Sequence, residues 1–80
     1  MVKVSVSMRR FRQLLAEKNI SQNRLARRAG LTSGYMSQIL NGARNPSARA
    51  RKKLLDTINR SQRAKGLKEY AFDDLFAVGR

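Results

Sequence analysis

The stretch ISQNRLARRAGLTSGYMSQILNG, residues 20–42, decides the fold of this chain, because it reads as two short helices around a tight turn. Ser21 stands before the first of them, which is predicted over residues 22–29, and its hydroxyl can accept a free backbone N–H there. Gly30 stands where that helix should end, since glycine adopts the left-handed conformation at little cost.

The second helix of the stretch has the same kinds of start and stop residues. Thr32 is a candidate N-cap for a helix over residues 33–41, and Gly42 is its stop signal. Two short helices joined by a glycine-containing turn form the helix-turn-helix signature. We therefore expect the second helix to enter the major groove of DNA.

Charge is the informative part of the composition. The 80 residues include 18 Lys and Arg against 5 Asp and Glu, which gives a net charge of +13 and a pI near 11.7. Such self-repulsion opposes compaction, so it favours a polyanionic partner, with nucleic acid first, an anionic membrane second and mere solubility as the alternative. There is no apolar run of about 20 residues and no signal-peptide core, so we expect the chain to stay in the cytoplasm.

The residue types that are missing argue against an enzyme. The chain contains no Cys and no His, which removes disulfides, thiolate and imidazole chemistry and ordinary zinc sites. The few acids are scattered except for Asp73 and Asp74, and adjacent side chains make a poor acid–base pair. We expect no catalytic residues, no metal and no cofactor.

The two ends of the chain are predicted to pair. Residues 1–7 alternate apolar and polar side chains, which favours a short strand with Val2, Val4 and Val6 on one face. A lone strand is unstable, and the only other candidate strand lies around residues 76–78. The alternative is a frayed N-terminal arm.

Two further helices flank the central pair. Ser7 can cap a helix over residues 8–18, and Ser47, after Pro46, can cap another over about residues 48–60. The apolar stripes of these helices are Met8, Phe11, Leu14 and Leu15 in the first, and Ala50, Leu54, Leu55 and Ile58 in the second.

The remainder of the chain changes character twice. Residues 59–70 are polar and basic, which predicts a linker or an extended helix end. A C-terminal segment over residues 71–80 follows, with Asp73 as the cap of a single helical turn. Residues 67–76 combine acidic and large apolar side chains, so this part either covers the core or meets another protein chain.

The second helix of the central pair has an unusual outer face. Met36, Ile39 and Leu40 fall on one side at helical spacing, whereas the side chains pointing away are short, polar and uncharged. Hydroxyl and amide groups match the donor and acceptor patterns of base edges. Gly34 weakens the helix by up to about 1 kcal/mol relative to Ala, which the close approach of another backbone would explain.

Residues 8–58 resemble the phage repressor/Cro-type (XRE-like) helix-turn-helix family. The resemblance rests on Leu14-Leu15, Ile20-Ser21-Gln22, Leu25-Ala26, Ala29-Gly30, Met36-Ser37-Gln38-Ile39, Asn41-Gly42 and Asn45-Pro46-Ser47. It implies an all-α bundle of four or five helices that binds duplex DNA, and some members also have a short N-terminal strand and a similar C-terminal segment. Residues 1–80 are thus expected to form one helix-turn-helix domain.

The resemblance also implies which residues contact DNA. The positions that read bases are matched by Ser33, Gly34, Ser37 and Gln38. Phosphate contacts are implied for Gln22, Asn41 and Arg44, to which we add Tyr35, Arg10 and Arg49. Better-known relatives carry Gln where this chain has Ser33 and Gly34, so Gln38 becomes the best candidate for reading adenine.

The function expected from these features is sequence-specific regulation of transcription, with a repressor favoured. The resemblance suggests a bacterial or phage-encoded regulator, of phage or plasmid-like type. The family often binds a pseudo-palindromic site as a homodimer, and the sequence itself leaves the oligomeric state open. The alternative is a protein-interaction module, such as an antitoxin-like or recruitment partner, that uses residues 67–76.

Overall fold

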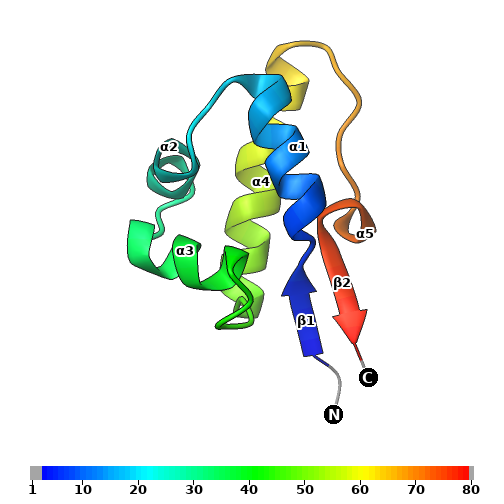
Figure 1. Cartoon of the computed structure of the whole chain (residues 1–80). Helices are drawn as coiled ribbons and strands as arrows, with labels where there is room; N and C mark the ends of the chain where they lie inside the picture. Colours follow the sequence, from blue (N-terminus) through cyan, green and yellow to red (C-terminus); the bar gives the residue numbers. More distant parts are fainter. Residues whose placement is uncertain (1–2, 80) are drawn as a thin grey trace.

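The computed structural model describes residues 3–79, which form five helices and a two-stranded sheet (Figure 1). Among these residues, none of the helices has the length and apolar character needed to cross a lipid bilayer. The elements, in chain order, are β1 (Lys3–Val6), α1 (Met8–Lys18), α2 (Gln22–Arg28), α3 (Ser33–Leu40), α4 (Ala48–Ala64), α5 (Phe72–Leu75) and β2 (Phe76–Gly79).

The helix-turn-helix pair, α2 and α3, forms as the capping residues predict. The Ser21 hydroxyl accepts the N–H of Arg24 at 3.1 Å, and the Thr32 hydroxyl accepts that of Tyr35 at 3.1 Å. Gly30 has a φ of +73°, a left-handed conformation that L side chains rarely adopt. Both helices end one residue earlier than expected.

The hydrophobic core lies where α1, α4 and the helix-turn-helix pair meet. In Figure 1, α1 passes in front of α4, while α2 and α3 lie together on one flank. The expected all-α bundle is therefore confirmed. The largest side chains with less than 2% exposure are Phe11, Leu25, Met36, Ile39, Leu54, Ile58 and Leu75.

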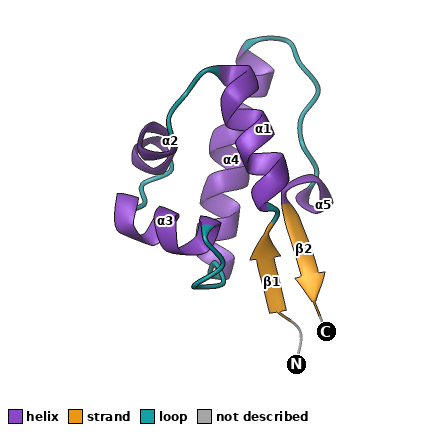
Figure 2. Cartoon of the chain, in the orientation of Figure 1, coloured by secondary structure: helices purple, strands orange, loops and turns teal. Residues whose placement is uncertain are grey.

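The two ends of the described chain pair, as the alternating valines predicted. β1 and β2 are antiparallel, with Val4 opposite Val78 in the ladder (Figure 2). Val4 packs against the core, and Val2 lies outside the described residues. Ser7 is the N-cap residue of α1, as expected, but its side chain makes no capping hydrogen bond, and its backbone N–H donates to Leu75 O at 2.9 Å.

The fourth helix does not end near Arg60: of the two alternatives for the start of residues 59–70, a basic linker or an extended helix end, the structure has the extended helix end. α4 continues to Ala64, and two of its polar residues, Asn59 and Gln62, are only 9% and 7% exposed. The Asn59 amide donates to Tyr70 O at 2.9 Å and accepts the Tyr70 N–H at 2.7 Å. The polarity of these side chains favoured a linker, but both of them bind the backbone of residues 67–76, the segment that returns along the core after α4. We call these residues the returning segment.

The returning segment covers the core. Leu75 and Phe76 are buried, and the Phe76 ring packs 6.1 Å from that of Phe11 and 4.9 Å from that of Phe72, measured between centroids. The expected cap at Asp73 is wrong, because α5 begins at Phe72 and the Asp74 carboxylate accepts the N–H of Ala71 at 2.8 Å. Of the two interpretations of residues 67–76, core cover accounts for these apolar side chains.

Replacing Asn59 with Ala should lower the free energy of unfolding by about 1–3 kcal/mol, because both backbone groups of Tyr70 lose their partner. Urea unfolding measures this change. Arg60→Ala, on the exposed neighbouring residue, is the control and should shift stability by less than about 0.5 kcal/mol. Equal losses in the two variants would contradict the role of the Asn59 amide.

Candidate nucleic-acid interface

The face of α3 that points away from the core is polar and uncharged. Met36, Ile39 and Leu40 are buried beneath the helix, and their burial fixes its rotation. On the opposite side Ser33, Gly34 and Gln38 are exposed, and Ser37 is half-buried. The sequence-predicted readout residues therefore share one accessible surface of α3.

Two residues of this surface, Ser37 and Asn41, contact each other. Asn41 is the C-terminal cap of α3, and its side-chain amide donates to the Ser37 hydroxyl at 3.4 Å. The Ser37 oxygen is thereby occupied from one side. Gln38 makes no such side-chain contact among the described hydrogen bonds, and its backbone carbonyl accepts the N–H groups of Ala43 and Arg44.

Gly34 is not required by the fold around it. It lies inside α3, and it is not among the glycines with positive φ. A Cβ atom added there would meet no heavy atom within 4 Å. Neither the conformation nor the packing of the chain therefore explains a residue that weakens the helix.

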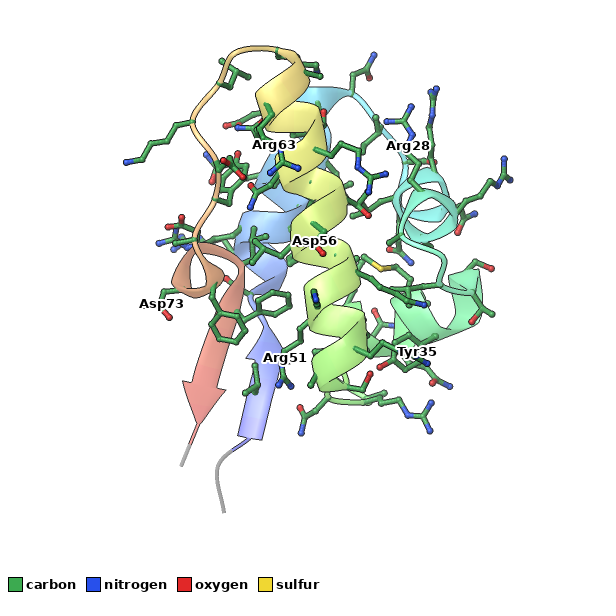
Figure 3. The ribbon with its side chains drawn as sticks, turned by 180° about the vertical axis from the view of Figure 1, so that it is seen from behind. Arg28, Tyr35, Arg51, Asp56, Arg63 and Asp73 are labelled. Carbon is green, nitrogen blue, oxygen red and sulfur yellow. The ribbon has the colours of Figure 1, made fainter. Side chains whose placement is uncertain are left out.

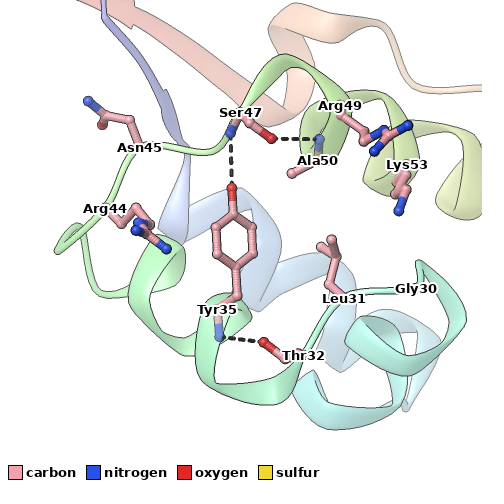
Figure 4. Close-up of a pocket in the computed structure, with 10 residues that line it drawn as sticks. All are labelled: Gly30, Leu31, Thr32, Tyr35, Arg44, Asn45, Ser47, Arg49, Ala50 and Lys53. Carbon is pink, nitrogen blue, oxygen red and sulfur yellow. Dashed lines mark hydrogen bonds between the residues drawn. The ribbon is translucent and has the colours of Figure 1, made fainter.

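Tyr35 ties α3 to the start of α4. Its hydroxyl accepts the backbone N–H of Ser47 at 3.0 Å, while the Ser47 hydroxyl caps α4 by accepting the N–H of Ala50 at 3.1 Å (Figure 4). The guanidinium carbon of Arg44 lies 5.6 Å from the centroid of the Tyr35 ring, which is within the range of a cation–π contact. One aromatic side chain thus positions both the loop after α3 and the first turn of α4.

An open pocket of about 570 Å³ lies between this tyrosine and α4. Three cationic side chains line it, and none of the five acids does, within the described part of the chain. Sequence reasoning missed one of the cations, Lys53, although its position four residues after Arg49 places both on one side of α4. The lining residues are Gly30, Leu31, Thr32, Tyr35, Arg44, Asn45, Ser47, Arg49, Ala50 and Lys53 (Figure 4).

A smaller pocket of about 240 Å³ extends the surface toward α2. Its lining combines Asn23 and Arg27 of α2 with Leu31 and with Ser33, the first residue of α3. Arg27 was missed because a cation near the end of a helix is already favoured by the helix dipole. The structure places it beside a predicted readout residue.

The sequence-predicted phosphate residues fall into two groups. Tyr35, Arg44 and Arg49 line the larger pocket, while Asn41 caps α3 and the half-buried Gln22 opens α2.

Arg10 lies apart from all of them. Its guanidinium is 3.8 Å from the Asp74 carboxylate, beside α5. The two side chains are 59% and 43% exposed, so this ion pair is screened by solvent and contributes little to stability.

Other kinds of site are not apparent in the described residues. Across residues 3–79, no group of three or more His, Cys, Asp or Glu side chains is arranged to hold a metal ion. The arrangement on and around α3 instead offers hydrogen-bonding groups in the centre and cations at the margin. That distribution suits a polyanion whose bases are accessible.

Comparison with known proteins agrees with this geometry. Searches of curated proteins and of solved structures returned no match. A family model described as a helix-turn-helix domain matches residues 9–65, which include α2, α3 and all of α4. Because this match covers well over half of the sequence, the chain belongs to the helix-turn-helix domain family, and it is of the XRE/Cro-like type.

Proposed function

We propose that this protein is a sequence-specific regulator of transcription that inserts α3 into the major groove of duplex DNA. The observation that carries the proposal is the exposed, uncharged polar face of α3 beside a pocket lined by Arg44, Arg49 and Lys53. The major groove of B-DNA, about 12 Å wide, admits a helix and displays a different donor–acceptor pattern for each base pair. Cations at the margin would neutralise phosphates and release counterions.

Within this proposal, Gln38 is the principal reader of sequence. Its exposed amide can donate to and accept from adenine N7 and N6 at once, which a hydroxyl group cannot do. Ser33 offers one further hydroxyl, and the Ser37 hydroxyl is already engaged by Asn41. Gly34 allows the backbone of α3 to approach the base edges closely.

The residues around α3 would set its register on the duplex. Tyr35 holds the backbone of Ser47, so the cations of the loop and of α4 are presented from a fixed platform. Gln22 and Asn41 would contact phosphates from the ends of α2 and α3. Arg10 is left out of this set because of its position beside Asp74.

Repression is the regulatory outcome that we propose, since a protein that occupies an operator blocks access by other proteins without needing further machinery. Binding as a homodimer to two half-sites one helical turn apart would double the contact area. The cytoplasm, where such DNA lies, is the corresponding location. The alternative role as a protein-interaction module receives less support, because residues 67–76 devote Leu75 and Phe76 to the core.

Selection of bound duplexes from a random pool at moderate salt tests the proposal. The wild-type chain should enrich a defined sequence, and the symmetry of that sequence would report the oligomeric state on DNA. Gln38→Ala should relax the preference at one base pair, at about 1–3 kcal/mol, because its bidentate contact is lost. Gln13→Ala, on the exposed face of α1, is the matched control. Failure of the wild type to enrich any sequence would overturn the proposal.

Gly34→Ala should separate stability from binding. The added methyl group meets nothing within 4 Å in the free protein, so helix propensity should raise the free energy of unfolding by up to about 1 kcal/mol. The same methyl group should obstruct the groove and weaken specific binding about tenfold, or ~1.4 kcal/mol. Thermal unfolding and titration of the selected duplex measure the two effects. Unchanged affinity would show that no DNA atom approaches Gly34 closely.

Arg44→Gln should reduce the slope of log K against log[salt] by about 0.9, because one phosphate contact is lost. It should weaken binding to specific and random duplexes alike, since phosphate contacts carry no sequence information. The control is Arg60→Gln, which removes the same charge from an exposed position of α4 outside the pocket. If both variants changed the slope equally, the effect would come from net charge alone.

A further inference from the structure

A second, more enclosed pocket lies between the end of α1, the side of α2 and the C-terminal half of α4. Its volume is about 320 Å³. Buried Leu25 and Ile58 contribute apolar surface to it, and Asn19, Thr57 and Ser61 contribute an amide and two hydroxyls. Figure 3 shows Arg28, another lining residue, beside the upper part of α4.

The charges around this pocket are all of one sign. Lys18, Arg24, Arg28 and Lys65 line it, and none of the five acids does, as far as the described residues extend. The C-terminal ends of α1 and α4 each contribute about half a negative charge, which together offset only about one of the four cations. The pocket therefore keeps a clear positive excess.

One of these cations is held in place by a buried partner. The Lys18 ammonium donates to the side-chain oxygen of Gln62, and Gln62, which is 7% exposed, donates in turn to Lys68 O at 2.9 Å. Burial and then the charge of Lys65 lower the pKa of Lys18, while Glu17 acts in the opposite direction. An anion seated here would offset the repulsion between the two lysines.

This pocket is separate from the surface around α3. In the α4 region, the pocket beside Tyr35 is lined by residues between 47 and 53, whereas this one is lined by residues between 57 and 65, and the two pockets share no lining residue. At a rise of 1.5 Å per residue, the centres of these two sets of lining residues lie about 15 Å apart along α4. The cations of the second pocket are thus not needed for the contacts proposed for α3.

We propose that this cationic pocket, lined by Lys18, Arg28, Ser61 and Lys65, binds a phosphate group. Ammonium and guanidinium groups form charge-assisted hydrogen bonds with phosphate oxygens, and the hydroxyls of Thr57 and Ser61 supply neutral donors. The phosphate can belong to a free ligand such as a nucleotide or to the backbone of a duplex beyond the α3 contact. The assignment does not rest on the function proposed for α3.

Titration of the full chain with inorganic pyrophosphate, followed by the shifts of backbone amide resonances at low salt, tests the assignment. The shifts should saturate and concentrate at Asn19, Thr57 and Ser61. The double variant Arg28→Gln with Lys65→Gln should weaken binding at least about tenfold, since two charge-assisted contacts are lost. The same spectra establish that the variant is folded.

A charge-matched double variant is the control. Arg12→Gln with Lys52→Gln removes two exposed cations that line neither pocket, and it should weaken pyrophosphate binding less than about twofold. Equal weakening by both double variants, or shifts scattered over the whole basic surface, would overturn the assignment.

Adding duplex DNA to the pyrophosphate-bound protein identifies the source of the phosphate. Displacement of pyrophosphate from Ser61 would assign the pocket to the DNA backbone, and simultaneous binding would assign it to a free ligand. Either result supports a phosphate site. A failed pyrophosphate titration would leave duplex selection by α3 unaffected, so the two proposals fail separately.

Discussion

The burial of one three-residue stripe determines how this protein can meet a partner. Met36, Ile39 and Leu40 insert the inner side of α3 into the core, and this alone decides that Gln38 and Gly34 face outward. Burial of apolar surface stabilises a fold by about 25 cal/mol per Å². Rotation of α3 by one residue position would expose these apolar side chains to water, and much of that stabilisation would be lost. The Tyr35–Ser47 hydrogen bond then fixes the helix relative to α4. The exposed face of α3 is therefore specified by side chains that are themselves buried.

The second constraint is electrostatic, because a chain with a small core has a net charge of +13. Two ion pairs, Arg10 with Asp74 and Arg63 with Glu69, form among the side chains that the structure describes, and both are exposed. Most cations are left without an acidic partner there, gathered in part along two ends of α4. Self-repulsion of this size lowers the stability of the free protein, and a bound polyanion would relieve it. The same positive charges thus oppose folding of the free protein and favour binding of a polyanion.

The sequence was most informative about helix starts that depend only on residues close to each other in the chain. Ser21, Thr32 and Ser47 cap their helices because a hydroxyl three residues before an N–H needs no tertiary partner to do so. It was least informative for Asn59 and Gln62, whose partners depend on where the chain returns after α4.

The candidate site shows the same division. The exposure of the candidate readout residues of α3 follows from helical periodicity, but the placement of Arg10 beside Asp74 and the gathering of Lys53 with Arg44 depend on packing between elements. The DNA roles of these residues, and the single-domain organisation over residues 1–80, stay predictions.

The pairing of β1 with β2 has a consequence for the order in which the fold assembles. The ladder joins residues from opposite ends of the described chain, so its formation closes a loop of nearly the whole sequence and costs the corresponding chain entropy. The α2–α3 pair, in contrast, forms through contacts between residues that are near in sequence. We expect the helical core to be in place before the strands meet. The sheet and α5 would then form last, and they could separate from the core while α3 stays helical.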